Sequence, residues 1–151
     1  MGPVKALTLF YTHYFDVYGR SRRFQYVWIL FLHFCLMVLM AAGVYTLGSS
    51  GDVLDANGLK GVNAFGSLLI SLYSLVWIAS IIPWLTLCIR RFHDMNHTGW
   101  LVALFMGLWL IPPIGALGSV IQFFWLLLGS GTPGANSYGQ DPRFLHRDVF
   151  D

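Results

Sequence analysis

The sequence predicts an all-α integral membrane protein, a small helical bundle of about four transmembrane or re-entrant helices. The 151 residues are 56% hydrophobic and only 11% charged, whereas about a quarter of a soluble domain's residues are charged. Three long stretches contain no Asp, Lys or Arg, and the chain contains no Glu at all. Disordered chains are poor in apolar residues, so this composition excludes disorder as well.

The chain opens with a lead-in over residues 1–26. Within it, residues 7–18 alternate apolar, aromatic and polar types, a pattern typical of a short amphipathic helix in the membrane interface. An irregular segment anchored by aromatic side chains explains the same pattern, and both alternatives stay open. A cluster of arginines, Arg20, Arg22 and Arg23, then precedes the first apolar stretch.

The first two apolar stretches each predict one transmembrane helix, because the hydrocarbon core requires about 20 apolar residues. They cover residues 27–47 and 64–89. Pro83 lies late in the second stretch and is expected to kink its end. Between them, residues 48–63 are rich in Gly, Ser, Asp and Asn, a composition that predicts a flexible external loop.

The third apolar stretch, residues 100–128, is too long for one straight span. At 1.5 Å per residue it would reach about 43 Å, against a core of about 30 Å. Pro112 and Pro113 interrupt it, and one helix is not expected to continue through such a pair. We therefore expect a hairpin of two short helices, at residues 100–111 and 114–128; a single kinked crossing is the alternative.

The distribution of basic residues favours the hairpin. Eight of the nine lie in three segments, residues 1–26, the connector 90–99 and the tail 129–151, while the external loop holds only Lys60. Basic segments stay in the cytoplasm. The N-terminus, the connector and the tail are therefore expected on the cytoplasmic side, with residues 1–151 forming a single membrane domain.

Three polar segments flank the spans, and each carries a motif. Residues 14–23 are YFDVYGRSRR, residues 90–100 are RRFHDMNHTGW, and residues 131–142 are GTPGANSYGQDP. Together they resemble the family called domain of unknown function 805, whose motifs are G-R-x-x-R-x-E-Y-W, R-R-x-H-D-x-x-x-S-G-W and G-T-P-G-x-N-x-Y-G-x-D-P. These are small bacterial inner-membrane proteins. The resemblance implies a fold and a location in the bacterial inner membrane, but no activity.

The sequence departs from the family motifs at three positions. Gln25 stands where the family usually has an acidic residue, Val27 where it usually has Trp, and Thr98 where it usually has Ser. The last change keeps the hydroxyl group. Because Gln25 carries no carboxylate, this position offers neither a general base nor an ion-pair partner.

The arginines of the cytoplasmic face are the candidate binding residues. Each basic residue near an anionic leaflet contributes roughly 1 kcal/mol, and arginine binds phosphate through two hydrogen bonds. A helix opening near Trp100, capped by Thr98, adds an N-terminus that attracts anions. The alternative role of the arginines is to set topology and anchor lipid without a defined ligand. The residues expected to bind an anion, a lipid or a partner are Arg20, Arg23, Arg90, Arg91, His93 and Trp100.

The remaining polar residues of this face are expected to form a structural latch. Asp94 is expected to pair with Arg20 or Arg23 and so to tie the first two spans together. A lone Asp among arginines stays ionised, which suits pairing better than proton transfer. The tail is expected to fold back and bond to the connector. The latch residues are Asp16, Asp94, Asn136, Tyr138 and Asp141.

No catalytic residue, metal site or cofactor is predicted. His93 and His97 stand four residues apart, a spacing that on a helix would direct both imidazoles to one metal. Asn96 and Gly99 interrupt such a helix, however, and the neighbouring arginines would repel a cation. We therefore expect His93 to act in capping or in hydrogen bonding at the interface.

The spans themselves carry few polar residues. His33 is expected to hydrogen-bond across helices, for instance to Ser71 or Ser74, and Gln122 is another polar residue of the apolar stretches. A channel or transporter is therefore the third-ranked function. Small residues at the helix surfaces favour a homo-oligomer or a membrane-protein partner; they are Ala42, Gly43, Gly66 and Ser67.

These observations predict a non-enzymatic structural or accessory membrane protein that binds anionic lipid or a partner protein at its cytoplasmic face. Its expected role is in envelope maintenance or as a subunit of a membrane complex. The alternative is a membrane-embedded enzyme or carrier acting on a phosphate-bearing lipid, with Arg91, His93 and Asp94 at its centre. Nucleic-acid binding is not indicated, because the net charge is only +2 and the basic residues lie at membrane depth.

Overall fold

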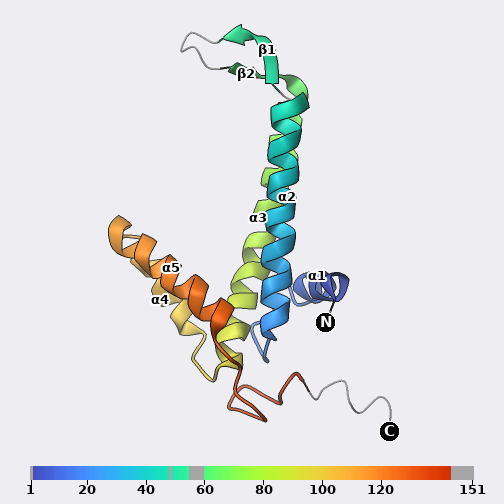
Figure 1. The fold of residues 1–151 in the computed structure, drawn as a ribbon. Coiled ribbons are helices and arrows are strands. Elements are labelled where there is room, and N and C mark those ends of the chain that lie inside the picture. The colour runs from blue at the N-terminus through green and yellow to red at the C-terminus, as the bar shows by residue number, and fades with distance from the viewer. Residues whose placement is uncertain (1, 48, 55–59, 144–151) are drawn as a thin grey trace. The chain divides into compact units, whose positions relative to one another are not determined.

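The computed structural model describes residues 2–47, 49–54 and 60–143, and this part of the chain contains five helices and one two-stranded hairpin (Figure 1). The last residues of the predicted tail, 144–151, lie outside the described residues, as does the middle of the predicted external loop. The chain divides into two compact units. One comprises Met1–Leu30 and Ile82–Asp151, and the other comprises Phe31–Ile81.

Two helices are long and apolar enough to cross a membrane, as the sequence predicts. They are α2, Arg23–Leu47, and α3, Ala64–Asp94. Only 6% of the most apolar window of α2 and 11% of that of α3 is buried. A core helix of a soluble protein would be mostly buried, whereas large exposed apolar surfaces mark contact with lipid or a partner.

Both helices are longer than the apolar stretches that predicted them. The helix α2 begins at Arg23 instead of residue 27, and α3 continues to Asp94 instead of ending at residue 89. The predicted stretches were defined as uncharged spans, and the helices that contain them extend further, to Arg23 and to Asp94. Cations are favourable in the last turn of a helix, where they complement its dipole, so Arg90 and Arg91 do not end α3.

The unit Phe31–Ile81 contains the two helical segments that flank the predicted loop. That loop contains a hairpin, in which β1, Ser49–Leu54, pairs antiparallel with β2, Lys60–Val62. The helical segments approach closely at Gly43, where a Cβ atom would lie 3.1 Å from Cδ1 of Leu69. Gly43, one of the small residues expected at an interface between chains, thus faces the neighbouring helix of its own chain.

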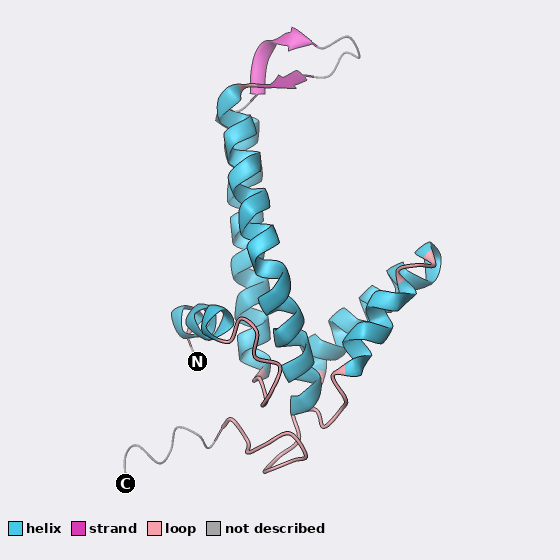
Figure 2. Cartoon of the chain, turned by 180° about the vertical axis from the view of Figure 1, so that it is seen from behind, coloured by secondary structure: helices cyan, strands magenta, loops and turns pink. Residues whose placement is uncertain are grey.

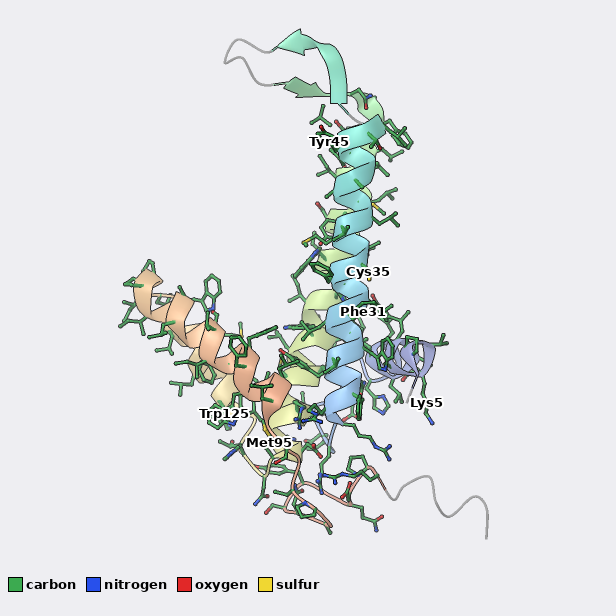
Figure 3. All side chains as sticks on the ribbon, in the orientation of Figure 1. Lys5, Phe31, Cys35, Tyr45, Met95 and Trp125 are labelled. Carbon is green, nitrogen blue, oxygen red and sulfur yellow. The ribbon has the colours of Figure 1, made fainter. Side chains whose placement is uncertain are left out.

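His33 lies in the same unit, against an aromatic side chain. Its ring meets that of Trp77 edge to face, with 6.1 Å between the centroids. Ser71 and Ser74, the hydroxyl partners expected for His33, donate to carbonyls one turn earlier in α3. Phe31, Cys35 and Tyr45, labelled along α2 in Figure 3, are exposed.

The other unit carries the hydrophobic core. The helix α1 covers Pro3–Thr12, so the lead-in contains a helix that begins and ends earlier than residues 7–18. Ala6 and Phe10, four residues apart and therefore on one face of α1, are fully buried. They pack with residues from the start of α2, the end of α3 and the following helices; these are Tyr26, Ile29, Leu87, Cys88, Phe92, Met95, Val102, Phe105 and Leu126.

The third apolar stretch forms a hairpin, as predicted. The helices α4, Trp100–Leu108, and α5, Pro112–Leu128, lie side by side (Figures 1 and 2). The two prolines form the first turn of α5 instead of separating the helices, because a fixed φ and a missing N–H suit that position. With nine residues, α4 is about 14 Å long. This is about half of the roughly 30 Å thickness of a hydrocarbon core.

The two helices of the hairpin approach each other closely at Gly115. A Cβ atom at Gly115 would lie 2.7 Å from Cα of Trp109 and 2.8 Å from the carbonyl oxygen of Leu108. Both are backbone atoms, which have no flexible end to move aside. A side chain at this position would therefore force the two helices apart.

Gly115→Ala is expected to lower the free energy of unfolding by about 1–3 kcal/mol, the usual cost of overpacking. Gly107→Ala is the matched control, because Gly107 is in α4 and nothing lies within 4 Å of its Cβ position. That change is expected to be neutral or to stabilise by up to about 1 kcal/mol. Denaturant unfolding of the protein in detergent, followed by circular dichroism, measures both. Equal losses would contradict the close approach.

Candidate functional site

The site is built at the end of α3, which closes in a left-handed turn. Asn96 has φ +59°, a conformation that Asn adopts more readily than most residues. The N–H of His97 donates to the carbonyl of Phe92 at 2.9 Å, and that of Asn96 donates to the carbonyl of His93 at 3.0 Å. This is the Schellman pattern of hydrogen bonds. It ends the helix between the two histidines, and His97 packs against Trp125 with 5.3 Å between centroids.

Asp94, in the last turn of α3, pairs with two arginines. Its Oδ1 lies 3.1 Å from the guanidinium of Arg20, and its Oδ2 lies 2.8 Å from Nη1 of Arg91. The side chains of Arg20, Arg91 and Asp94 are 1%, 0% and 7% exposed. The sequence predicts a pairing of Asp94 with Arg20 or Arg23, and the structure has the pair with Arg20. We refer to these three residues as the ion triad.

Arg20 also holds the tail. Its Nη1 donates to the carbonyl of Gly134 and its Nη2 to that of Thr132, both at 2.6 Å, and a longer bond of 3.4 Å reaches Gly139. The guanidinium presents five N–H donors in a fixed plane, and here they face a carboxylate and a ring of carbonyls. The tail therefore folds back onto the connector side, as the sequence predicts.

Arg91 ties α3 to α5. Its Nε donates to the carbonyl of Leu126 at 3.1 Å, and its Nη2 donates to that of Gly129. These carbonyls stand at the C-terminal end of α5, where a helix leaves its last acceptors unpaired and its dipole attracts cations. Figure 3 labels Met95 and Trp125 at this junction, beside the polar side chains of the tail.

The tail in turn caps α3. The N–H and hydroxyl of Thr132 donate to the carbonyl of Asp94 at 2.8 and 3.1 Å, and Nδ2 of Asn136 donates to that of His93 at 2.9 Å. A Cβ atom at Gly131 would overlap the carboxylate of Asp94. Sequence reasoning missed Thr132 and Gly131, although the G-T-P-G motif contains both.

Of the other predicted latch residues, Asp16 and Asp141 bond to nearby backbone groups, whereas Tyr138 reaches α3. Oδ1 of Asp16 accepts a bond from the N–H of Tyr18 at 2.9 Å, within the lead-in. The ring of Tyr138 stacks on that of His93, with centroids 3.9 Å apart and planes 5° from parallel. Asp141 is buried and accepts from the N–H groups of two tail residues. Of the predicted latch, only Asp94 belongs to the ion triad.

The predicted binding residues divide among three environments. Arg20 and Arg91 belong to the ion triad. Arg90 is buried, with Nη2 unpartnered among the described residues. Arg23 lines a cleft of about 430 Å³, while His93 and Trp100 line a separate groove. We call the first the arginine cleft; its lining residues are Arg22, Arg23, Phe24, Asp94, Ser130, Gly131, Pro142 and Arg143.

One of the residues that line the arginine cleft, Arg22, has a nitrogen that is unpartnered among the described residues. Nη2 of Arg22 is buried and has no hydrogen-bond partner in the part of the chain that the structure describes. Gln25, the departure from the family motif, is also buried; it accepts a bond from the hydroxyl of Ser21 at 2.6 Å, and its Nε2 is unpartnered among the same residues. Within the described ranges, no three His, Cys or Asp side chains gather closely enough to hold a metal ion.

Burial and hydrogen bonding oppose each other at Asp141. Burial by itself raises the pKa of this carboxyl. The backbone N–H groups of Arg143 and Gly134, at 2.9 and 3.2 Å, and the charges of Arg143 and Arg20 favour the carboxylate. Their combined effect is larger, so the pKa of Asp141 lies below its ordinary value.

A family model described as Protein of unknown function (DUF805) matches residues 14–140, and so includes most of all three motif segments. The chain belongs to the DUF805 family. The DUF805 chain resembles Inner membrane protein YhaH of Escherichia coli (strain K12), with 29% identity over 136 residues, 87% of this chain and 90% of YhaH. Inner membrane protein YhaI of the same strain is 39% identical over 67 residues, 44% of this chain, which spans about half the length of YhaI. No solved structure matches.

In this DUF805 protein, Asp94→Asn is expected to lower the free energy of unfolding by about 3–5 kcal/mol, because it leaves two buried guanidinium groups without their counter-charge. Asp16→Asn removes the same charge from a partly exposed site and keeps an acceptor for Tyr18, so its expected cost is below about 1 kcal/mol. Denaturant unfolding in detergent measures both. Similar costs would show that the ion triad does not hold the helix ends together.

Asp141 is expected to make stability depend on acidity. Because its pKa is lower in the folded state than in the unfolded chain, its contribution is complete above about pH 4 and is lost as the pH falls through the folded pKa. The thermal midpoint of Asp141→Asn should lie below that of the parent at pH 6. The difference should shrink as both are acidified toward pH 3. A difference that stays constant over this range would contradict a depressed pKa.

Proposed function

We propose that this DUF805 protein is a non-enzymatic accessory protein of the bacterial inner membrane whose arginine cleft binds the phosphate of anionic lipids. Its two candidate spans and the names of YhaH and YhaI support the inner-membrane location. The observation that carries the proposal is the unpartnered Nη2 of Arg22 in a cleft with two further arginines. The proposed role is in envelope maintenance or as a subunit of a membrane complex.

Orientation is part of the proposal. The lead-in arginines, the end of α3 and the folded-back tail meet in one unit. Basic segments remain on the cytoplasmic side of a bacterial membrane. The arginine cleft would therefore face the cytoplasmic leaflet, with the N-terminus on the same side.

The arginine cleft suits an anion because its positive charges exceed its negative ones. The carboxylate of Asp94 is already matched by the ion triad. Arg22 and Arg23 add two positive charges, while Arg143, whose side chain is 54% exposed, pairs with Asp141 at 3.5 Å. A volume of about 430 Å³ is in the range of small-ligand sites, and arginine can grip two oxygens of a phosphate group.

The geometry favours binding over catalysis. The alternative enzyme or carrier would centre on Arg91, His93 and Asp94. Both oxygens of Asp94 face guanidinium groups. The guanidinium of Arg91 donates to Asp94 and to two carbonyls at the end of α5. These contacts leave no carboxylate oxygen directed at a substrate, so they support a structural role for this pair.

Arg22→Gln and Arg23→Gln are each expected to weaken binding of phosphatidylglycerol about fivefold, the equivalent of roughly 1 kcal/mol per basic residue. Binding of phosphatidylcholine should not change. Native mass spectrometry of the full-length protein, titrated with each lipid, measures the two affinities. Lys5→Gln is the charge-matched control, because Lys5 is on α1 and does not line the arginine cleft.

A cleft variant that binds phosphatidylglycerol as the Lys5→Gln control does would contradict the proposal. The arginines would then serve topology and anchoring alone. Each variant is first compared with the parent by thermal unfolding, so that a loss of folding is not taken for a loss of binding. A variant that folds normally but loses lipid binding shows that the arginine cleft acts in binding, whereas the ion triad acts in folding.

A further inference from the structure

A second groove, distinct from the arginine cleft, lies among α3, α4, the lead-in and the tail. Its volume is about 490 Å³. The apolar side chains that line it come mainly from α3 and α4 and include Leu85, Ile89, Val102, Ala103 and Met106. Ligand sites of this size are typically apolar with a few well-placed polar groups. We call it the apolar groove.

The apolar groove has no charged wall. Among the described residues that line it, none is Lys, Arg, Asp or Glu. Its rim carries Tyr18 and Trp100, both largely exposed, and such aromatic residues gather where a membrane meets water. A ligand with a charged head would find no counter-ion here, so the groove suits an uncharged amphiphile.

One polar atom at the apolar groove is unused. Nδ1 of His93 is buried and has no hydrogen-bond partner among the described residues, while the ring stacks on Tyr138. In a neutral imidazole whose Nε2 donates to a carbonyl, Nδ1 is an acceptor. In that tautomer Nδ1 can accept a hydrogen bond from a ligand hydroxyl.

We propose that the apolar groove binds a diacylglycerol, an uncharged lipid with two acyl chains and one free hydroxyl. One acyl chain lies along Ile89, Val102 and Ala103. The hydroxyl donates to Nδ1 of His93. An ester or ether without a hydroxyl cannot supply this hydrogen, and a lipid phosphate would enter a groove without cations. The inference does not depend on the arginine cleft, because diacylglycerol carries no phosphate.

The test uses the full-length protein in nanodiscs of phosphatidylcholine that contain a diacylglycerol with a photoreactive acyl chain. After illumination, mass spectrometry is expected to locate the label on the groove-lining residues of α3 and α4. Unlabelled diacylglycerol should compete for this labelling. Its methyl ether, which has the same chains but no hydroxyl hydrogen, should require about tenfold more, the effect of leaving one buried acceptor unpaired. Equal competition would overturn the hydrogen bond to His93.

Three variants separate the apolar groove from its surroundings. Ala103→Trp fills it and should abolish the competed labelling, whereas Leu104→Trp, one residue along α4 and outside the groove lining, should not. His93→Phe keeps a ring against Tyr138 but lacks the acceptor, so diacylglycerol and its ether should compete equally. Equal labelling of the two tryptophan variants would overturn the proposed site.

Arg22→Gln distinguishes this proposal from the anionic-lipid function. It removes a group of the arginine cleft and should leave diacylglycerol labelling unchanged. A large loss of diacylglycerol binding in Arg22→Gln would overturn the separation of the two sites. Thermal unfolding of each variant shows that it is folded before its binding is compared.

Discussion

Asp94 holds two guanidinium groups, those of Arg20 and Arg91, where solvent barely reaches. A buried charge is tolerated only when it is paired and hydrogen-bonded, and one carboxylate cannot neutralise two arginines. Backbone carbonyls of the tail and of α5 supply the remaining acceptors. The need to pair both guanidinium groups therefore holds the tail, the end of α3 and the base of the hairpin together, although these segments are far apart in the sequence.

The same face of the protein contains polar groups of two kinds. Those of the ion triad are buried and fully engaged, whereas Nη2 of Arg22 and Nδ1 of His93 are buried without partners among the described residues, and each belongs to a cleft or groove. Nε2 of Gln25 and Nη2 of Arg90 are unpartnered too, but neither residue lines either cavity. An unused group beside an open volume is the combination that supports a ligand.

Hydropathy was sufficient to predict α2 and α3, because a membrane-spanning helix must be apolar along a continuous stretch of sequence. The proline pair was sufficient to predict the hairpin of α4 and α5, because a proline interrupts the helix in which it lies. The placement of the charges also predicted that Asp94 pairs with Arg20 or Arg23, and the structure has Arg20. Hydropathy could not indicate that α3 continues past residue 89, because the partners that stabilise Arg91 lie at Leu126 and Gly129. Charge alone also could not distinguish Arg20, whose guanidinium donates to backbone carbonyls, from Arg22, whose Nη2 has no partner among the described residues. Backbone carbonyls are present at every residue, so the sequence does not indicate which of them an arginine will reach.

The tail's carbonyls at Thr132, Gly134 and Gly139 have a consequence for biogenesis. They leave the ribosome more than a hundred residues after Arg20, yet Arg20 requires them for burial. Until then its guanidinium stays hydrated at the membrane surface, since burying it unsatisfied would cost several kcal/mol. The base of the protein therefore closes last. A chain that ends before residue 132 therefore lacks the carbonyls that Arg20 requires.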